Sequence, residues 1–592
     1  MANERRAWRF GEAFLAVLVV GVLGVLGWCG QLQLGRWSEY QKRVERQQLK
    51  LVPWEARRGM IVDRRGRVLA VSTRGESVRL DPVLLEDAGE TSRQLGGILG
   101  LDAAGLLEKI DLRRGSRFLW VKRFVTKEQA EAVRGLEFRG VVVESEYRRE
   151  YPMGQLAAHV LGYTDVDGRG LEGVEREYDE YLSGESGLWR LRSDAMRRPV
   201  GAQGGSRGPR HGRHLVLTID AVIQTVVEEQ LAATVERFQA LGASAVVMDV
   251  RTGEVLALAN VPTFNPAEAR QSDPEVRRNR ALTDPVEPGS TFKPFTVAAA
   301  IEGGYVKVDT AIFCHNGLYA GRGIGVIREY ENHGYGELTV AEIIARSSNI
   351  GSAKVAQKMG KEYFFGMIEK FGFGQETGID LPGEGAGILM PLSEWKWGQY
   401  ALTRAAYGQG PVAVTAMQLV RGFACLSNGG RLVTPRVGRA VLEEDGRVGR
   451  DFVGEALSGE SPQVISEGLS REMVGTVLRG VVSRPGGTAH NVDLAGYGVY
   501  GKTGTAQVPR RDGCGYAADK YVASFVAGAP GHEPRIVVLV MVREPDRSLG
   551  LGYTGGRVAA PAVRAILEQT LAYLGVEGEA ESVCGGAWLV QR

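Results

Sequence analysis

One segment near the middle of the chain joins a turn to a helix and carries both a serine and a lysine: Glu287-Pro288-Gly289-Ser290-Thr291-Phe292-Lys293-Pro294-Phe295. The Pro288-Gly289 pair predicts a turn, and the alanine-rich run at 296–302 predicts a helix that stops at Gly303. Ser290 is therefore expected at the start of this helix. Because residues three apart share one helix face, Ser290 and Lys293 should point in the same direction.

This arrangement suits nucleophilic catalysis. A serine hydroxyl becomes a good nucleophile when a neighbouring base takes its proton, and a lysine can be that base if burial or a second cation lowers its pKa. Backbone N–H groups at the helix start could also face a developing oxyanion. A Ser-x-x-Lys pair is weak evidence by itself, however, because both residue types are common and two positions are free.

Two further motifs make the pattern more specific. Ser347-Ser348-Asn349 lies downstream, and Lys502-Thr503-Gly504-Thr505 lies near the end of the chain. Serine β-lactamases and penicillin-binding proteins carry Ser-x-x-Lys, Ser-Asp-Asn and Lys-Thr-Gly together. Here the second motif has Ser348 in place of aspartate, and the other two match fully.

The overall composition is typical of a globular protein with room for two or three domains. The chain has 592 residues, of which 44% are hydrophobic and 24% charged, and its net charge is +2. This small charge argues against nucleic-acid binding driven by electrostatics. The five cysteines show no Cys-x-x-Cys pair and no metal-ligand spacing, so we predict free thiols, no metal and no cofactor.

A long apolar run near the N-terminus predicts a membrane anchor. Residues 13–35 contain no charged side chain, and their length fits one crossing of about 20 residues. A cleaved signal peptide is the alternative, but no small-x-small cleavage site follows the run. We therefore expect a cytoplasmic tail at 1–12 and a transmembrane anchor at 13–35. Arginines flank both ends, so the positive-inside rule does not fix the orientation.

The region 36–205 is expected to be a non-catalytic module. A charged helix is predicted over 39–51, and apolar residues that alternate around Asp63-Arg64-Arg65-Gly66 predict a hairpin. No nucleophile and base occur together here, and His159 lies in an apolar stretch that is typical of a packed, structural histidine. A Gly- and Arg-rich segment at 200–214 marks the boundary with the next domain.

Residues 213–575 are predicted to form an α+β domain with an antiparallel sheet and packed helices. A helix from near Asp220 is followed by a hairpin of strands at 244–250 and 255–259, and three more strands are expected at 497–506, 521–526 and 535–542. Thr339 and Glu342 form a capping box that starts a helix just before Ser347. Residues 576–592 are expected to be a C-terminal tail.

Taken together, these motifs resemble those of the class B penicillin-binding proteins, the monofunctional peptidoglycan transpeptidases. The resemblance covers nearly the whole chain and includes the segments 407–410 and 415–418. Segments 121–123, 162–165 and 371–384 are similar to the division and sporulation branch more than to the elongation branch. The fold that this implies is a membrane-anchored, β-rich pedestal or dimerisation module at 36–205, followed by a transpeptidase domain of the serine β-lactamase type.

The resemblance also implies catalytic roles for Ser290, Lys293, Ser347, Asn349 and Lys502. Ser290 would attack the penultimate D-Ala carbonyl of a stem peptide, and Lys293 would take its proton. Ser347 would relay a proton to the leaving amine, while Asn349 orients Lys293. Lys502 would help to keep Lys293 neutral and would bind the substrate carboxylate together with the substrate-binding residues Thr503, Gly504 and Thr505. The backbone N–H groups of Ser290 and Thr505 would form the oxyanion hole.

The expected activity is cross-linking of stem peptides during septal wall synthesis, with inhibition by β-lactams. The implied partners are a membrane glycosyltransferase and divisome proteins, and the implied location is the inner (plasma) membrane, crossed once, with the catalytic domain outside the cytoplasm. The open alternatives are an elongation or sporulation transpeptidase, a β-lactamase, and a non-catalytic scaffold or β-lactam sensor. A β-lactamase would need a positioned carboxylate to activate water, and the sequence does not identify one.

Overall fold

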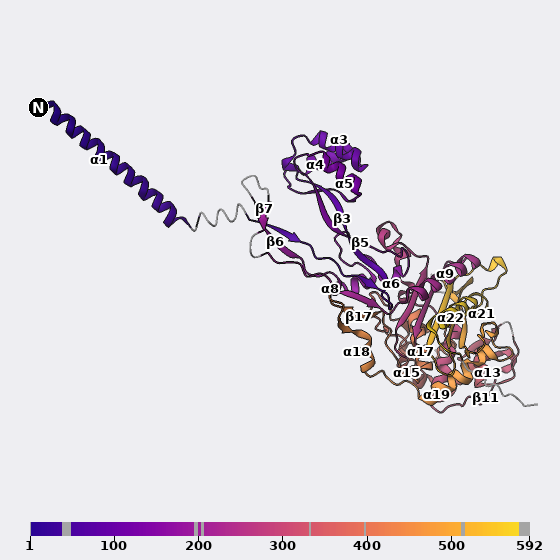
Figure 1. Ribbon diagram of the computed structural model, residues 1–592. Coiled ribbons are helices and arrows are strands. Elements are labelled where there is room, and N and C mark those ends of the chain that lie inside the picture. The colour runs from indigo at the N-terminus through magenta and orange to yellow at the C-terminus, as the bar shows by residue number, and fades with distance from the viewer. Residues whose placement is uncertain are drawn as a thin grey trace, which may run out of the picture. The chain divides into compact units, whose positions relative to one another are not determined.

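The computed structural model describes residues 2–37, 39, 49–193, 199–202, 206–330, 333–395, 398–510 and 515–578 (Figure 1). They form two compact units. The first comprises residues 1–57 and 184–211, and the second comprises residues 58–183 and 212–592. Residues 58–183 of the predicted pedestal thus share one unit with the predicted transpeptidase domain.

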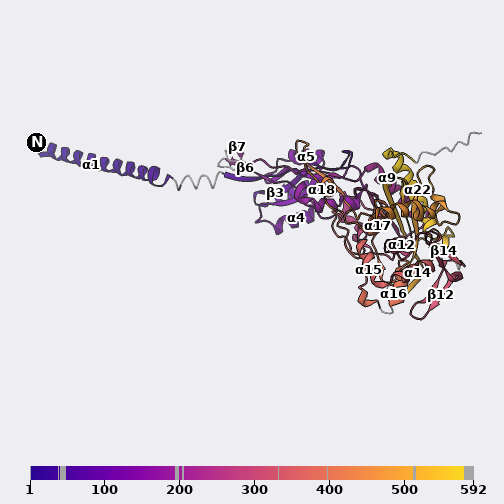
Figure 2. The same cartoon turned by 90° about the horizontal axis from the view of Figure 1, so that it is seen from below.

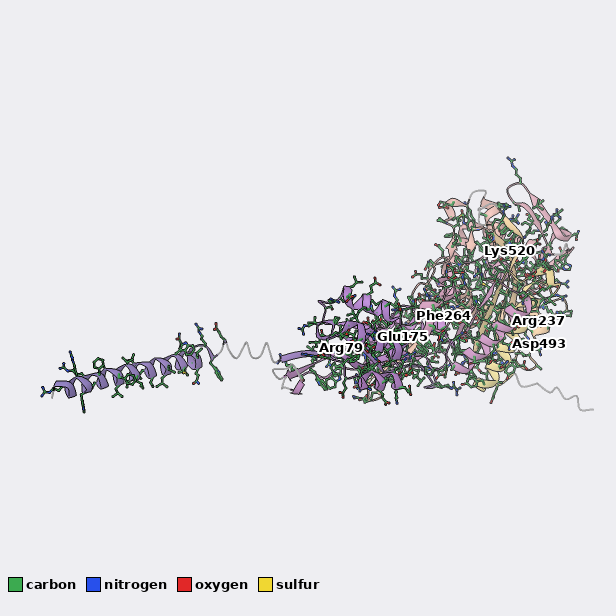
Figure 3. All side chains as sticks on the ribbon, turned by 90° about the horizontal axis from the view of Figure 1, so that it is seen from above. Arg79, Glu175, Arg237, Phe264, Asp493 and Lys520 are labelled. Carbon is green, nitrogen blue, oxygen red and sulfur yellow. The ribbon has the colours of Figure 1, made fainter. Side chains whose placement is uncertain are left out.

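The first unit contains the apolar helix and a small sheet. Helix α1 spans Ala2–Gly30 and continues as a π-helical turn, Gln31–Gly35. Its segment Trp8–Leu34 has a mean hydropathy of 2.4, enough for one membrane crossing, and its side chains stand exposed along the helix (Figure 3). The sheet has the order β1-β6-β7 and consists of Leu49–Trp54, Gly187–Ser193 and Pro199–Ala202.

The prediction of a helix over 39–51 is wrong at the C-terminal end of that segment. Residues 49–51 belong to strand β1, which pairs antiparallel with β6 from Leu49 opposite Arg192 to Trp54 opposite Gly187. This long-range strand pairing overrides the local helix propensity of the lysines and glutamines in this segment. Residues 40–48 lie outside the described part of the chain.

The second unit begins with a seven-stranded sheet of order β18-β17-β8-β2-β3-β4, with β5 also paired to β3. The predicted hairpin is confirmed as β2 (Ile61–Val62) and β3 (Val68–Leu80). The other strands are β4 (Leu119–Val125), β5 (Val141–Glu150), β8 (His214–Leu217), β17 (Gly438–Leu442) and β18 (Val448–Asp451). Strands from both sides of the predicted domain boundary therefore share one sheet.

A helical head lies at the far end of β3 and β5 (Figure 1). It consists of α3 (Ala88–Leu99), α4 (Ala103–Leu112) and α5 (Lys127–Gly135), and it has its own small apolar core around Leu95 and Ile110. Gly100 ends α3 in the left-handed conformation, with φ 67°, and Asp102 caps α4. Near the other end of these strands lie the short helices α6 (Ala158–Leu161), α7 (Gly173–Glu177) and α8 (Asp179–Leu182).

The predicted α+β catalytic domain is built on a five-stranded antiparallel sheet of order β10-β9-β21-β20-β19. The strands are β9 (Gly242–Asp249), β10 (Val255–Val261), β19 (Tyr500–Pro509), β20 (Tyr516–Ala529) and β21 (Ile536–Arg543). Helices α9 (Ala221–Phe238) and α22 (Ala560–Leu574) pack on this sheet and on each other, and α17 (Ala416–Ser427) also packs on β9 and β21. Strand β19 ends the sheet, and its outer edge faces the turn that carries Ser290.

A helical layer completes the domain, with α12, α14 and α16 packed in succession (Figure 2). Its main helices are α12 (Lys293–Glu302), α13 (Val340–Ala345), α14 (Asn349–Met359), α15 (Lys361–Lys370) and α16 (Gly398–Ala405). Helix α12 is buried from Lys293 to Ala300, and Phe295 packs against Phe371, Phe373 and Phe423. The helix that begins just after Ser290 is thus held rigidly in the core.

Candidate active site

Ser290 lies on a tight turn that the neighbouring chain fixes in place. Residues Gly289–Phe292 form a 3-10 turn that leads directly into α12, as the sequence predicts. Gly289 has φ 55° and donates its N–H to the carbonyl of Gly408 at 2.9 Å. A Cβ on Gly408 would lie 2.3 Å from the Gly289 carbonyl oxygen, so only glycine fits there. The motif at 407–410 therefore supports the Ser290 turn from outside.

Gly504 lets strand β19 approach the same turn. A Cβ at this position would lie 2.5 Å from Ser524 Oγ and 2.8 Å from Thr291 Cγ2. The resemblance implied a substrate-binding role for Gly504, whereas the structure places protein atoms, among them those of the serine turn, against it. Thr503 and Thr505 on either side of Gly504 line the cavity beside Ser290.

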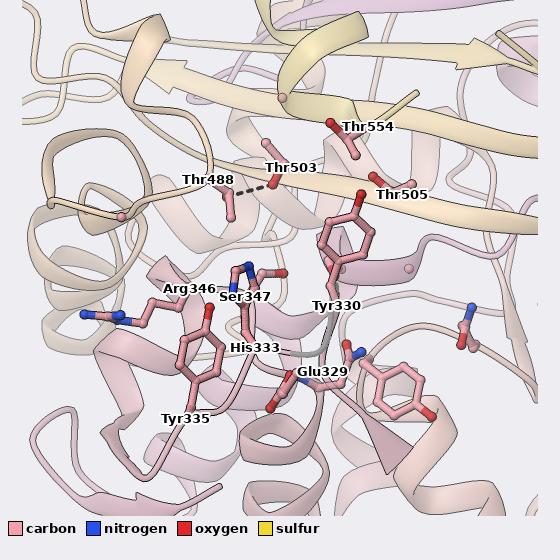
Figure 4. A pocket seen from close by; sticks show the side chains of 17 residues that line it. Glu329, Tyr330, His333, Tyr335, Arg346, Ser347, Thr488, Thr503, Thr505 and Thr554 are labelled. Atoms are coloured by element: carbon pink, nitrogen blue, oxygen red, sulfur yellow. Dashed lines mark hydrogen bonds between the residues drawn. The ribbon is translucent and has the colours of Figure 1, made fainter. Parts of the chain in front are cut away.

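The cavity in front of Ser290 measures about 310 Å³ (Figure 4). It brings together Ser290, Ser347, Asn349, Thr503 and Thr505 from three distant parts of the sequence. Its wall also contains residues that the sequence motifs do not mark, among them Glu329, Tyr335, Arg346, Thr488 and Thr554. Thr503 Oγ1 donates to Thr488 Oγ1 at 2.8 Å, which links β19 to the loop before it.

Two buried lysines meet at Ser347 behind this cavity. Lys293 Nζ donates to Asn349 Oδ1 at 2.8 Å and to Ser347 Oγ at 3.2 Å, and also to the Ser347 carbonyl. Lys502 Nζ donates to the same Ser347 Oγ at 2.9 Å and to the Thr503 carbonyl at 3.0 Å. Ser347 itself has φ 60°, a left-handed conformation that costs free energy for a residue with a side chain. The hydroxyl of Ser347 thus bridges both ammonium groups.

Burial changes the protonation of both lysines. Lys293 and Lys502 are completely buried. Burial lowers the pKa of Lys293 to about 7, although the negative charge of Glu329 acts in the opposite direction. Burial, and then the positive charge of Lys293, lower the pKa of Lys502 well below its ordinary value. A neutral Lys293 is therefore accessible near neutral pH, as a general base requires.

Glu329 is a site residue that sequence reasoning missed. It follows β13 (Gly325–Arg328) and is buried. Its carboxylate accepts the backbone N–H groups of Asn349 at 2.7 Å and Ile350 at 3.2 Å, together with the Ser348 hydroxyl. Asn349 Nδ2 also donates to the Arg328 carbonyl at 3.0 Å. The segment 328–329 thus holds the Ser347-Ser348-Asn349 motif in place.

The remaining expectations concern histidine, cysteine and metals. His159 is buried, its Nε2 lies 2.9 Å from the Val276 carbonyl oxygen, and burial lowers its pKa to about 4, which fits a structural histidine. Cys29, Cys314 and Cys425 are free thiols, and Cys514 and Cys584 lie outside the described residues. In the part of the chain that the structure describes, no cluster of side chains is suited to a metal ion.

Two family models match the chain. The penicillin binding protein transpeptidase domain matches residues 243–568, and the penicillin-binding protein dimerisation domain matches residues 53–217. Among solved structures, penicillin binding protein 3 from Mycobacterium tuberculosis in complex with aztreonam has a TM-score of 0.68 and 28% identity, and the match covers 89% of this chain and 98% of that one.

Similar curated proteins carry consistent names. The probable peptidoglycan D,D-transpeptidase PenA of Neisseria meningitidis is 34% identical over 88% of this chain and 85% of its own length. Stage V sporulation protein D of Bacillus subtilis is 34% identical over 89% of this chain and 80% of its own. The peptidoglycan D,D-transpeptidase FtsI of Escherichia coli is 31% identical over 97% of this chain and 93% of its own. Because these similarities extend over both domains, they confirm the resemblance seen in the motifs: the chain belongs to the class B penicillin-binding proteins and is a peptidoglycan D,D-transpeptidase.

Proposed function

We propose that Ser290 is the nucleophile with which this transpeptidase cross-links stem peptides during septal wall synthesis. The observation that carries the proposal is the Ser347 hydroxyl, which accepts hydrogen bonds from both Lys293 and Lys502 behind the cavity that Ser290 lines. A base with a lowered pKa and a second buried lysine thus meet at one hydroxyl that can relay a proton.

In the first half-reaction, Lys293 takes the proton of Ser290 Oγ as the oxygen attacks the penultimate D-Ala carbonyl. The oxyanion forms in front of the backbone N–H groups of Ser290 and of Thr505 on the outer edge of β19. Thr503 and Thr505, which line the cavity, bind the terminal carboxylate, and Gly504 sets the strand against the serine turn. Lys502 is buried behind the cavity and acts on the site through its hydrogen bond to Ser347 Oγ. The C–N bond then breaks, Ser347 passes a proton to the departing D-Ala amine, and an acyl ester on Ser290 remains. A second stem peptide's amine attacks this ester and completes the cross-link.

The cavity gives little support to the β-lactamase alternative. Among the described residues that line it, Glu329 carries the only carboxylate. Because that carboxylate is occupied by the backbone of Asn349 and Ile350 and by the Ser348 hydroxyl, it is poorly placed to activate a deacylating water. A long-lived acyl-enzyme with β-lactams is the consequence that we expect.

The direct test is labelling of the detergent-solubilised full chain with fluorescent penicillin, with the adduct mapped by mass spectrometry. We expect a stable adduct on Ser290 that Ser290→Ala abolishes while the melting temperature is unchanged. Rapid release of hydrolysed drug would favour a β-lactamase instead. The absence of an adduct on folded protein would favour a scaffold.

The cellular assignment is also a proposal. Helix α1 would cross the plasma membrane with residues 1–12 in the cytoplasm, since stem peptides are found outside it. The pedestal predicted at 36–205 would bind a membrane glycosyltransferase and divisome proteins, while 213–575 carries the catalysis. Similarity to FtsI supports the septal role, and similarity to Stage V sporulation protein D makes sporulation the second candidate. Depletion that produces filaments without septa, and co-purification with a glycosyltransferase, would support the first. A defect confined to spores would support the second.

A further inference from the structure

One corner of the active-site cavity carries a cation to which the proposed mechanism gives no task. Arg346 ends α13, directly precedes Ser347 and lines the cavity. Its guanidinium lies over the ring of Tyr335, 5.7 Å from the ring centre, and Tyr335 stacks on His333. Thr488 donates its backbone N–H to the carbonyl of Ala345 at 3.3 Å, which joins the loop before β19 to the same corner. We call Arg346, Tyr335, His333 and Thr488 the Arg346 corner (Figure 4).

Among the residues that the structure describes, no ion pair neutralises the charge of Arg346. Among the described residues that line the cavity, Arg346 carries the only guanidinium or ammonium group. The positive charge of Arg346 acts on the nearby carboxylate of Glu342. That carboxylate, however, accepts the backbone N–H of Thr339 at 2.9 Å and the Thr339 hydroxyl at 2.8 Å. Within the described chain no carboxylate forms an ion pair with Arg346, so this arginine is available for an anion that enters the cavity.

The reaction itself indicates which anion that is. Attack of the acceptor amine on the acyl ester reverses, in form, the departure of the D-Ala amine. Both amines therefore occupy the same position beside Ser347, where the proton is relayed. The acceptor peptide is larger than D-Ala, so the rest of its chain must extend beyond this position. The cavity wall that adjoins Ser347 there is the Arg346 corner.

We propose that Arg346 binds a carboxylate of the acceptor stem peptide and makes the enzyme prefer acceptors with a free carboxylate over amidated ones. The inference rests on the proposed roles of Ser290 and Ser347. In the step concerned, the acceptor nitrogen forms a bond to the acyl carbon, the bond from that carbon to Ser290 Oγ breaks, and the amine proton returns to Oγ through Lys293. Arg346 takes no proton, and its planar guanidinium holds the carboxylate while the amine attacks.

The test measures what fraction of the acyl-enzyme reacts with water and what fraction reacts with an amine. The detergent-solubilised full chain is acylated by a D-alanyl thioester, and the hydrolysis and aminolysis products are quantified with glycylglycine or glycylglycinamide as acceptor. These dipeptides differ in one carboxylate. We compare the wild-type chain with Arg346→Gln and Arg346→Lys, and with Arg322→Gln, an exposed arginine outside the cavity lining, as the matched control.

Arg346→Gln should lower the aminolysis-to-hydrolysis ratio for glycylglycine about tenfold, the size expected for one water-exposed charge-assisted hydrogen bond. The ratio for glycylglycinamide and the rate of acylation should stay unchanged, and Arg346→Lys should recover part of the loss. The inference would be overturned if Arg346→Gln lowered the aminolysis-to-hydrolysis ratio equally for both acceptors or for neither. It would also be overturned if the wild-type chain showed no aminolysis. Failure of the proposed function is distinguishable, because the wild-type chain would then form no acyl-enzyme from the thioester.

Discussion

Two clusters of buried charged groups in the second unit differ in whether opposite charges are paired. In the pedestal, Glu175 accepts from Arg58 Nε at 2.7 Å and from Arg149 Nε at 2.6 Å, and Arg58 also pairs with Asp179 at 2.6 Å. At the active site, Lys293 and Lys502 share the neutral hydroxyl of Ser347, and no carboxylate of the described residues is a direct partner of either lysine. Figure 3 shows Glu175 among the densely packed side chains of this unit.

The pKa shifts of the two clusters show what this difference achieves. Burial alone would raise the pKa of Glu175, but the charges of Arg149 and Arg58 outweigh it and lower that pKa. The pedestal charges therefore stay fixed at physiological pH. Burial lowers the pKa of Lys293 to about 7, so its proton can leave and return. Paired charges keep the pedestal groups ionised, whereas burial without a carboxylate partner among the described residues brings the pKa of Lys293 near neutral pH.

Replacement of Lys293 should give the largest effect on chemistry and leave the fold intact. Lys293→Ala removes the proposed base, and we expect the rate of acylation by fluorescent penicillin to fall about a thousandfold, within the range for general-base catalysis. Because no ion pair is broken and α12 stays packed in the core, the chain should still fold cooperatively, although the lost hydrogen bonds of Lys293 can lower the melting temperature. Lys370→Ala, at an exposed lysine on α15, is the control and should acylate normally. Acylation of Lys293→Ala within tenfold of the wild-type rate would refute the role.

In the pedestal, a substitution is expected to lower stability and leave the acylation rate unchanged. Glu175→Gln leaves Arg58 and Arg149 buried without their shared counter-charge, and the free energy of unfolding should fall by about 3–5 kcal/mol. Chemical denaturation followed by tryptophan fluorescence measures this loss. The protein that remains folded should acylate at the wild-type rate, because Glu175 does not line the cavity.

Glu455→Gln is the matched control for this measurement. It breaks an exposed ion pair with Arg450 instead of a buried one. An equal loss of stability in the two variants would show that burial of the pedestal charges is not what matters.

The sequence predicted the elements whose signals are local. The Thr339 and Glu342 capping box is present, with Glu342 N–H donating to Thr339 Oγ1 at 3.2 Å, and Asp220 caps α9 through Val222 N–H at 3.1 Å. The Arg251–Glu254 turn joins β9 and β10 as expected. The candidate catalytic residues could be named because each lies in a short sequence motif, and the structure then brings those motifs to one cavity.

Features that depend on distant contacts could not be found in this way. Glu329 lies 19 positions before Ser348 in irregular chain, and no spacing rule connects the two. Thr488 is marked by its contacts with Thr503 and Ala345, neither of which is close to it in sequence. Strand β1 exists because it pairs with β6, which is remote in sequence. Ser348, the departure from the aspartate form of the motif, is explained only by the structure: its hydroxyl donates to Glu329, where an aspartate would place a second carboxylate.

Glu329 allows the smallest expected effect to be tested, because its charge changes the pKa of Lys293 although the two side chains form no ion pair. Acylation needs neutral Lys293, so its rate should rise with pH through about 7 and then level off. The negative charge of Glu329 raises the pKa of Lys293. Glu329→Gln should therefore shift the rising limb to lower pH. Glu342→Gln, at a carboxylate that caps α13 and does not contribute to the pKa of Lys293, should leave the profile in place. A shift to higher pH in Glu329→Gln would mean that the carboxylate controls the rate through the position of Asn349 and not through its charge.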